Sequence, residues 1–345
     1  MITHDPNMLL IKPYFIDIDI EGSSVIRYGD ILRLLNMSIT PYTTKDYYKE
    51  KFLASFNNSV LANAISEIDL SLDNDGYTLF IKPQLSTYHT IFETFAQVYL
   101  AKKLFSNISQ VVMVDLPEDG ILNRASLQYN FLVNELIDEG IFVKEISKPS
   151  GTNIKIGKSI FVGPIGSNGI TIHAINALIE RFAGKSAKSS ANKKVYISRK
   201  LASTAKDLIN DSSRFSDDIR VYDEEVLEKY LYSLGYEILS PENFTTFEEQ
   251  LEYFSNTSML ISSTNAGLSN MIFMPSGSTV VELKTPLVRK VYNETRNNAI
   301  YIDETHDLYV PIAYQKGHLY VSLPVDDRSG FTAVEKLKQL GGISI

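Results

Sequence analysis

Short apolar runs alternate with amphipathic segments through the second half of the chain, and this rhythm restricts the fold more than any other sequence feature. The runs at 259–262 and 279–283 are continuous, which is typical of parallel strands buried on both faces. The segment 245–256 has helical spacing and opens on Thr245 and Glu248, the pattern of a capping box. Strands are also expected at 194–198 and 236–239, with helices at 223–234, 267–274 and 331–340. This order predicts an α/β domain that binds ligands at the carboxyl ends of parallel strands.

The first half shows the same order less sharply, and a polar stretch separates the two halves. Residues 184–194, GKSAKSSANKK, are small, polar and basic, as a linker is, although a long surface loop inside one domain has the same composition. We therefore predict α/β domains at 1–183 and 195–328, and a helical tail at 329–345 that is a candidate to pack back on the first domain. Elements expected in the first half are strands at 14–20, 76–81, 111–114 and 159–162 and helices at 88–104 and 123–139.

Composition disfavours several classes of protein and of site. The chain has no Cys, and its five His are not spaced as ligand pairs on one helix or strand, so we expect no disulfide framework and no metal site. A net charge of -8 disfavours a nucleic-acid partner. No apolar run is long enough for a transmembrane segment and no signal peptide is evident, so we expect a cytoplasmic protein. The basic residues of 184–194 leave peripheral membrane contact as an alternative.

The turn after the run at 259–262 is built from small residues. Small side chains let backbone N–H groups approach a phosphate, and the dipole of the following helix favours its negative charge. Many turns of this composition serve close packing alone, and that alternative stays open. The candidate donor-binding residues here are Thr264, Asn265, Ala266, Gly267, Leu268, Ser269 and Asn270.

Two charged residues lie where expected strands end. Arg199 follows the strand at 194–198, where a guanidinium can pair with phosphate; a plain surface arginine beside Lys200 is the alternative. Glu282 lies near the end of the run at 279–283, where a carboxylate can accept hydrogen bonds from ribose hydroxyls. An edge charge or a structural ion pair explains Glu282 equally well.

Several of these motifs occur together in one known family. They are Ile197-Ser198-Arg199, Arg220 with Asp223-Glu224, Gly235-Tyr236-Glu237, Pro241-Glu242, Phe247-Glu248-Glu249-Gln250, the segment from Asn265 to Asn270, and Phe273-Met274-Pro275-Ser276-Gly277-Ser278 through Glu282. Together they resemble glycosyltransferase family 61, and Tyr88-His89 is similar to the Tyr-x-His with which a helix of that family starts. The chain departs from the family pattern at Thr264, where the family has His, and at Asn265, where it has Gly.

This resemblance implies a GT-B fold, in which two Rossmann-like domains face a cleft. It implies a nucleotide-sugar donor on the second domain, a glycan acceptor on the first, and inverting transfer with no metal and no cofactor beyond the donor itself. A surface polysaccharide is the expected kind of acceptor. Arg199 and the turn 264–268 are assigned to the leaving phosphate, with Arg220 as a weaker second cation and Glu282 on the ribose.

Inverting transfer needs a base for the acceptor hydroxyl. His89 is our first candidate, because imidazole titrates near neutral pH, and Asp115 and Glu118 compete because they follow the strand at 111–114. Thr264, in place of the family His, favours either an altered donor or lost activity. The rival functions are therefore a catalytically silent nucleotide- or sugar-binding protein with the same fold, and a nucleotide-sugar epimerase.

Overall fold

The structure is a computed structural model. It describes residues 15–18, 24–27, 66–70, 76–83, 87–115, 126–147, 152–162, 172–183, 191–199, 221, 223–285, 287–293, 296–303 and 309–340. The chain divides into two compact units, Met1–Arg181 and Phe182–Ile345. Of the predicted linker, residues 184–190 lie outside the described residues, and Lys193 and Lys194 already belong to a strand.

The first unit is built on a five-stranded sheet. Its strands, in spatial order, are β1 (Phe15–Ile18), β8 (Ser159–Val162), β4 (Tyr77–Ile81), β5 (Ile108–Val114) and β6 (Phe142–Ile146). All neighbours pair in parallel except β1, which is antiparallel to β8. A smaller sheet has the order β2 (Ser24–Arg27), β7 (Thr152–Ile156) and β3 (Ser66–Asp69). The strand order of the main sheet reverses direction at β4, which places a topological switch point between β4 and β8.

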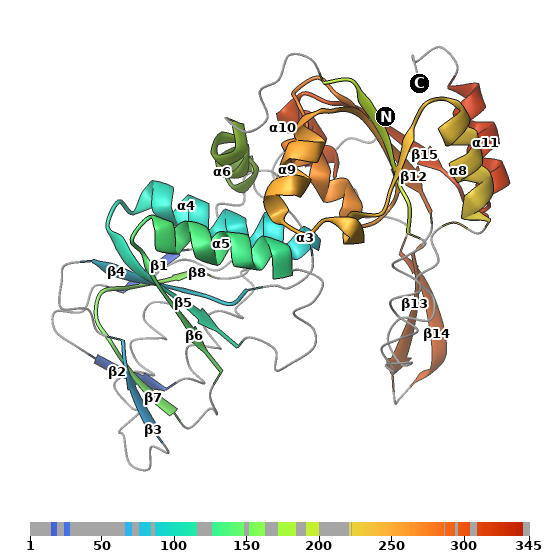
Figure 1. The fold of residues 1–345 in the computed structure, drawn as a ribbon. Coiled ribbons are helices and arrows are strands. Elements are labelled where there is room, and N and C mark those ends of the chain that lie inside the picture. Colours follow the sequence, from blue (N-terminus) through green and yellow to red (C-terminus); the bar gives the residue numbers. More distant parts are fainter. Residues whose placement is uncertain are drawn as a thin grey trace. The chain divides into compact units, whose positions relative to one another are not determined.

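The described helices of residues 87–183 include an irregular one. They are α3 (Thr87–His89), η2 (Thr90–Phe95), α4 (Ala96–Leu104), α5 (Ser126–Asp138) and α6 (Ile172–Ala183), which ends at the start of the second unit. The α4 and α5 helices lie along one face of the sheet (Figure 1), where the rings of Phe95 and Phe131 lie 6.2 Å apart. The segment 88–104, predicted as a single α-helix, contains a π-helical stretch, η2, directly after His89. Its wider turns are common at functional sites.

The second unit contains a fully parallel five-stranded sheet, which confirms the α/β prediction. Its spatial order is β10 (Glu237–Leu239), β9 (Lys193–Ile197), β11 (Thr257–Ser263), β12 (Thr279–Lys284) and β15 (Leu319–Pro324). In chain order the sheet starts at β9, steps outward to β10, and then returns past β9 to β11. The switch point therefore lies between β9 and β11, and ligands of such sheets bind in the crevice at its carboxyl side.

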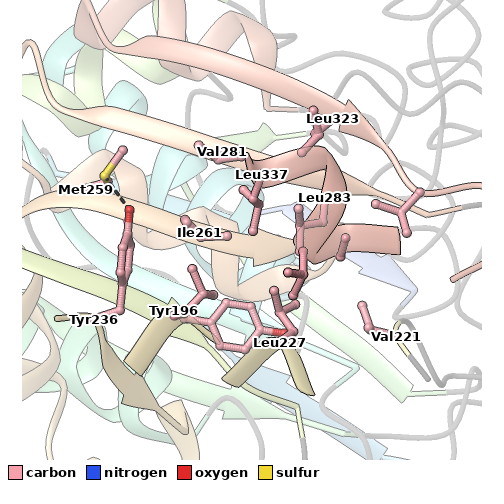
Figure 2. Packing of buried hydrophobic residues seen from close by; sticks show 14 residues of the cluster. Tyr196, Val221, Leu227, Tyr236, Met259, Ile261, Val281, Leu283, Leu323 and Leu337 are labelled. Atoms are coloured by element: carbon pink, nitrogen blue, oxygen red, sulfur yellow. Dashed lines mark hydrogen bonds between the residues drawn. The ribbon is translucent and has the colours of Figure 1, made fainter. Parts of the chain in front are cut away.

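Helices pack on both faces of this second sheet. On one face α8 (Glu224–Ser233) and α11 (Gly330–Gln339) enclose a buried cluster that includes Tyr196, Ile261, Val281 and Leu337 (Figures 1 and 2). On the other lie α9 (Phe247–Ser255) and α10 (Val310–Lys316), both packed against the 3-10 helix η5 (Ala266–Phe273). A short 3-10 helix, η4 (Pro241–Asn243), and a hairpin of β13 (Leu287–Asn293) and β14 (Arg296–Asp303) complete the unit.

The tail helix α11 packs on α8, and its apolar face, including Val334 and Leu337, belongs to the core of the second unit. One sequence prediction is corrected by the structure. The capping box of α9 is formed by Thr246 and Glu249, one residue later than predicted. Thr245 instead donates its hydroxyl to Glu249 at 2.7 Å, so both threonines contact the same carboxylate.

Candidate active site

The side chain of Asn265 makes several of the hydrogen bonds that hold the loop after β11. Its Nδ2 group donates to Ser262 Oγ at 2.8 Å and to the Ser263 carbonyl at 2.7 Å. Its Oδ1 atom accepts the Gly267 N–H at 2.6 Å, so Asn265 is the N-cap of η5. The Asn265 carbonyl also accepts the Tyr309 hydroxyl at 2.6 Å. The loop therefore has one fixed conformation at the carboxyl end of β11.

Two backbone amides of this loop remain for a ligand. The Thr264 N–H donates to a main-chain carbonyl of β12 at 3.1 Å. The N–H groups of Gly267 and Leu268 donate to the side chain and carbonyl of Asn265, at 2.6 and 3.1 Å. Within the part of the chain that the structure describes, the N–H groups of Asn265 and Ala266 make no hydrogen bond. Two adjacent amides at a helix N-terminus are an arrangement that can bind a phosphate.

Gly267 allows the loop to lie against β9. A Cβ atom at this position would lie 2.7 Å from Asn265 Oδ1 and 3.0 Å from Cγ2 of Ile197, closer than side chains pack. Ile197 is the last residue of β9, so the contact brings the loop to the switch point. Close packing therefore explains this glycine, which agrees with the alternative that the turn is built from small residues for packing alone. The same packing holds the two amides at the carboxyl end of the sheet.

The next residues of η5 lie beneath the loop. Asn270 is buried, donates to the Gly267 carbonyl at 2.9 Å and accepts from the side chain of Gln250. Leu268 and Ser269 are also buried. These predicted donor-binding residues are positioned to hold the loop rather than to present side chains at its surface. Gln250 is a supporting residue that the sequence did not single out for this role.

Glu282 and Thr264 form one buried hydrogen-bonded group. Thr264 Oγ1 donates to Glu282 Oε1 at 2.8 Å, and the hydroxyl of Tyr320 donates to Glu282 Oε2 at 2.6 Å. The Glu282 side chain is buried, so a ribose hydroxyl would reach it only by displacing one of these donors. The Thr264 proton points at the carboxylate, so it is not available to a phosphate oxygen. Tyr320 and Tyr309 are contributors that local sequence patterns do not reveal.

Arg199 has an acidic environment at the carboxyl end of β9. Its backbone N–H donates to Glu224 Oε1 at 3.1 Å, and the neighbouring Ser198 hydroxyl donates to Glu228 Oε1 at 2.6 Å. Burial raises the pKa of Glu224. The hydrogen bond from the Tyr196 hydroxyl and the positive charge of Arg199 lower this pKa and so partly offset the effect of burial. The charge of Arg199 therefore acts on Glu224 in the first turn of α8. Arg220, the second predicted cation, lies outside the described residues.

The base candidates lie in the first unit, after β4 and β5. His89 Nδ1 lies 2.6 Å from Glu93 Oε1, and the His89 side chain is 39% exposed whereas that of Glu93 is 7% exposed. Asp115 directly follows β5 with a positive φ of 58° and pairs with Lys82 through a 2.8 Å contact. That conformation is uncommon for a residue other than glycine, and such residues concentrate at functional sites. Glu118 lies outside the described residues.

Among the described residues, no three His, Cys, Asp or Glu side chains come together as metal ligands. None of the helices in the described ranges is long and apolar enough to cross a membrane.

Comparison with known proteins identifies the family. No curated protein sequence matches the chain. The sequence model of the Glycosyltransferase 61 family matches residues 87–281, more than half of the chain, from the start of α3 to within β12. The matched segment contains both His89 and the loop after β11. The chain therefore belongs to the glycosyltransferase 61 family and is a glycosyltransferase.

Proposed function

We propose that this glycosyltransferase moves a sugar from a nucleotide-sugar donor to a glycan acceptor, such as a surface polysaccharide, with inversion at the anomeric carbon and without a metal. The proposal includes a GT-B arrangement, in which the second unit binds the donor and the first unit binds the acceptor. It also includes a cytoplasmic location, where nucleotide sugars are available to the enzyme.

One observation carries the assignment of the donor site. At the switch point of the second sheet, the amides of Asn265 and Ala266 are adjacent and make no hydrogen bond within the described residues. The loop that presents them is fixed by the Asn265 side chain and by contact with Ile197. A diphosphate offers the acceptors that these amides lack, and the N-terminus of η5 favours its negative charge.

Departure of the nucleotide requires stabilisation of the charge that develops on its diphosphate. In our proposal the two amides supply fixed donors and Arg199 supplies positive charge, as oxyanion-binding groups do in other enzymes. Thr264 and Glu282 have a supporting role, since their hydrogen bond is internal. This revises the earlier assignment of Glu282 to the ribose.

His89 acts as the base in this proposal. Its Nε2 atom takes the proton from the acceptor hydroxyl while the hydroxyl oxygen attacks the anomeric carbon. The bond between that carbon and the phosphate oxygen breaks on the opposite face, and the nucleoside diphosphate leaves with the bonding electrons. Asp115 is less suited, because its carboxylate is already paired with Lys82.

A ligand screen tests the proposal. Nucleoside diphosphates and nucleotide sugars with each common base are added to the purified chain, and the melting temperature is recorded. A ligand at 100 times its Kd stabilises the folded state by about 2.7 kcal/mol, so at least one nucleotide should raise the melting temperature clearly.

Donors that bind are then incubated with and without glycan acceptors. Transfer with an inverted anomeric configuration supports the proposal. Binding without any turnover favours the silent binding protein, release of an isomer without acceptor favours the epimerase, and no binding by any nucleotide contradicts the proposed donor.

A further inference from the structure

Among the residues that the structure describes, the buried carboxylate of Glu93 in the first unit has its hydrogen bond with His89, the proposed base. Glu93 lies in η2 with its side chain 7% exposed, and its Oε1 atom is 2.6 Å from His89 Nδ1. Burying an ionised carboxylate is costly unless it is paired or hydrogen-bonded. Glu93 therefore depends on His89 for its stability in the folded chain.

The π-helical turns of η2 account for this close contact. Because i→i+5 hydrogen bonding takes more residues per turn than the 3.6 of an α-helix, residue i+4 lies more directly over residue i. His89 precedes the six π-helical residues 90–95, and Glu93 is the fourth residue after it. The irregular helix thus stacks the carboxylate on the imidazole.

No other charged group shares this contact among the residues that the structure describes. The Tyr88 ring meets the His89 ring edge-on, with centroids 5.3 Å apart. Burial, and then the charge of Glu93, raises the pKa of Tyr88, which keeps its hydroxyl protonated at neutral pH. From α5, Glu135 bonds Tyr99 and Arg181. At the carboxyl ends of β4 and β5, Lys82 pairs with Asp115.

We propose that Glu93 is a positioning residue for His89. Its carboxylate accepts a hydrogen bond from Nδ1–H, which fixes the ring and keeps the neutral imidazole in the tautomer whose Nε2 is unprotonated. In that tautomer Nε2 can accept the proton of an acceptor hydroxyl, and the carboxylate then faces the imidazolium that forms. Nε2 makes no hydrogen bond to a described residue, so it is available for this step. This inference rests on the proposed role of His89 as base.

The hydrogen bond is tested without any ligand. Nitrogen-15 NMR of the histidine rings distinguishes the two neutral tautomers, and the His89 signals are assigned by their loss in His89→Gln. We expect the Nδ1–H tautomer in the wild-type chain and a mixture in Glu93→Gln, whose amide can donate or accept at Nδ1. The matched control is Glu135→Gln, which changes another carboxylate of the same unit and should leave the His89 signals unchanged.

Kinetics then test the positioning role, using the nucleotide sugar that gives turnover in the screen above. Glu93→Gln should lower kcat at least about tenfold while the KM for the donor stays within about twofold, as for other carboxylate–histidine pairs. An Nε2–H tautomer in the wild-type chain overturns the proposal, and so does an unchanged kcat in Glu93→Gln. If His89→Gln itself retains full turnover, the assignment of the base fails, and that result is separate from the NMR outcome.

Discussion

The five-stranded sheets of the two units end in candidate sites of different construction. After β11, side chains are used to hold the main chain: Asn265 and Gly267 fix a loop that presents backbone amides, and Glu282 is buried beneath it. After β4, the backbone holds a side chain: the π-helix η2 places Glu93 against a His89 that is 39% exposed. The backbone amides after β11 suit the binding of a negatively charged ligand, whereas the paired imidazole and carboxylate after β4 suit the transfer of a proton.

The same contrast distinguishes two histidines, His89 in the first unit and His318 in the second. His89 is partly exposed and bonded to a carboxylate. His318 is buried in the second unit, where its Nε2 lies 2.9 Å from the Met271 carbonyl. Burial lowers the pKa of His318 to about 4. We therefore expect the first histidine to affect turnover and the second to affect stability.

The largest expected effect is on turnover. His89→Gln removes the base and should lower kcat by about 10² to 10⁴-fold, the usual contribution of general-base catalysis. The melting temperature should change little, because the ring is partly exposed and the glutamine amide can still donate a hydrogen bond to buried Glu93. Initial transfer rates and thermal unfolding measure the two quantities. Near-normal turnover of the folded variant would show that His89 is not the base. The proposed contrast between a charge-binding site in the second unit and a proton-transfer site in the first would then fail.

A smaller effect concerns stability in acid. The pKa of His318 is about 4 in the folded chain and 6.5 without burial, so the unfolded state binds more protons between these values. Above pH 6.5 His318 is neutral in both states and does not lower the free energy of unfolding. As the pH falls from 6.5 toward 4, protonation of His318 in the unfolded state lowers the free energy of unfolding by about 3 kcal/mol at most.

Residue 318 cannot titrate in His318→Gln, so this variant lacks the loss of stability that His318 causes in the wild-type chain. Between pH 6.5 and 4, the unfolding free energy of the variant should therefore rise relative to that of the wild-type chain. Chemical denaturation across this range measures the shift, and carboxylates common to both proteins cancel. A difference that does not depend on pH would contradict the prediction, because it would mean that His318 has the same pKa in the folded and unfolded chains.

Gly267→Ala should affect both stability and donor binding. The new methyl group would meet Asn265 Oδ1 and Ile197, and overpacking of this kind costs about 1 to 3 kcal/mol. Because the loop must move away from β9, affinity for nucleoside diphosphate should fall by more than the stability loss explains. Calorimetric titration at a temperature where both proteins are folded measures the affinity. Unchanged affinity would place the donor elsewhere.

The smallest predicted effect concerns the group beneath the loop. Tyr320→Phe removes a hydroxyl that donates to buried Glu282 and should cost about 1 kcal/mol of unfolding free energy. Tyr236→Phe is a matched control: its hydroxyl donates to the sulfur of Met259, which is a weak acceptor, so this variant should cost less. Donor affinity should stay within a few-fold in both variants. If Tyr320→Phe alone showed a large loss of donor affinity, that result would support the assignment of Glu282 to the donor ribose.

How far the sequence predicted these features depends on how local their signals are. Strands β11 and β12 were predicted because buried parallel strands are continuous apolar runs, and the loop between them because small residues follow β11. The π-helix was missed, since its apolar spacing is close to that of an α-helix. Glu93 had a usable signal, four residues after a histidine, whereas Tyr309 and Tyr320 reach the site only through tertiary packing.

The claim that a diphosphate binds at the loop after β11 has a direct residue-level test in NMR-detected amide hydrogen exchange. Without ligand, the N–H groups of Asn265 and Ala266 should exchange rapidly, because they make no hydrogen bond to a described residue. Adding the nucleoside diphosphate that most raises the melting temperature should protect both amides strongly. Protection confined to the first unit, with these two amides still exchanging rapidly, would contradict the account.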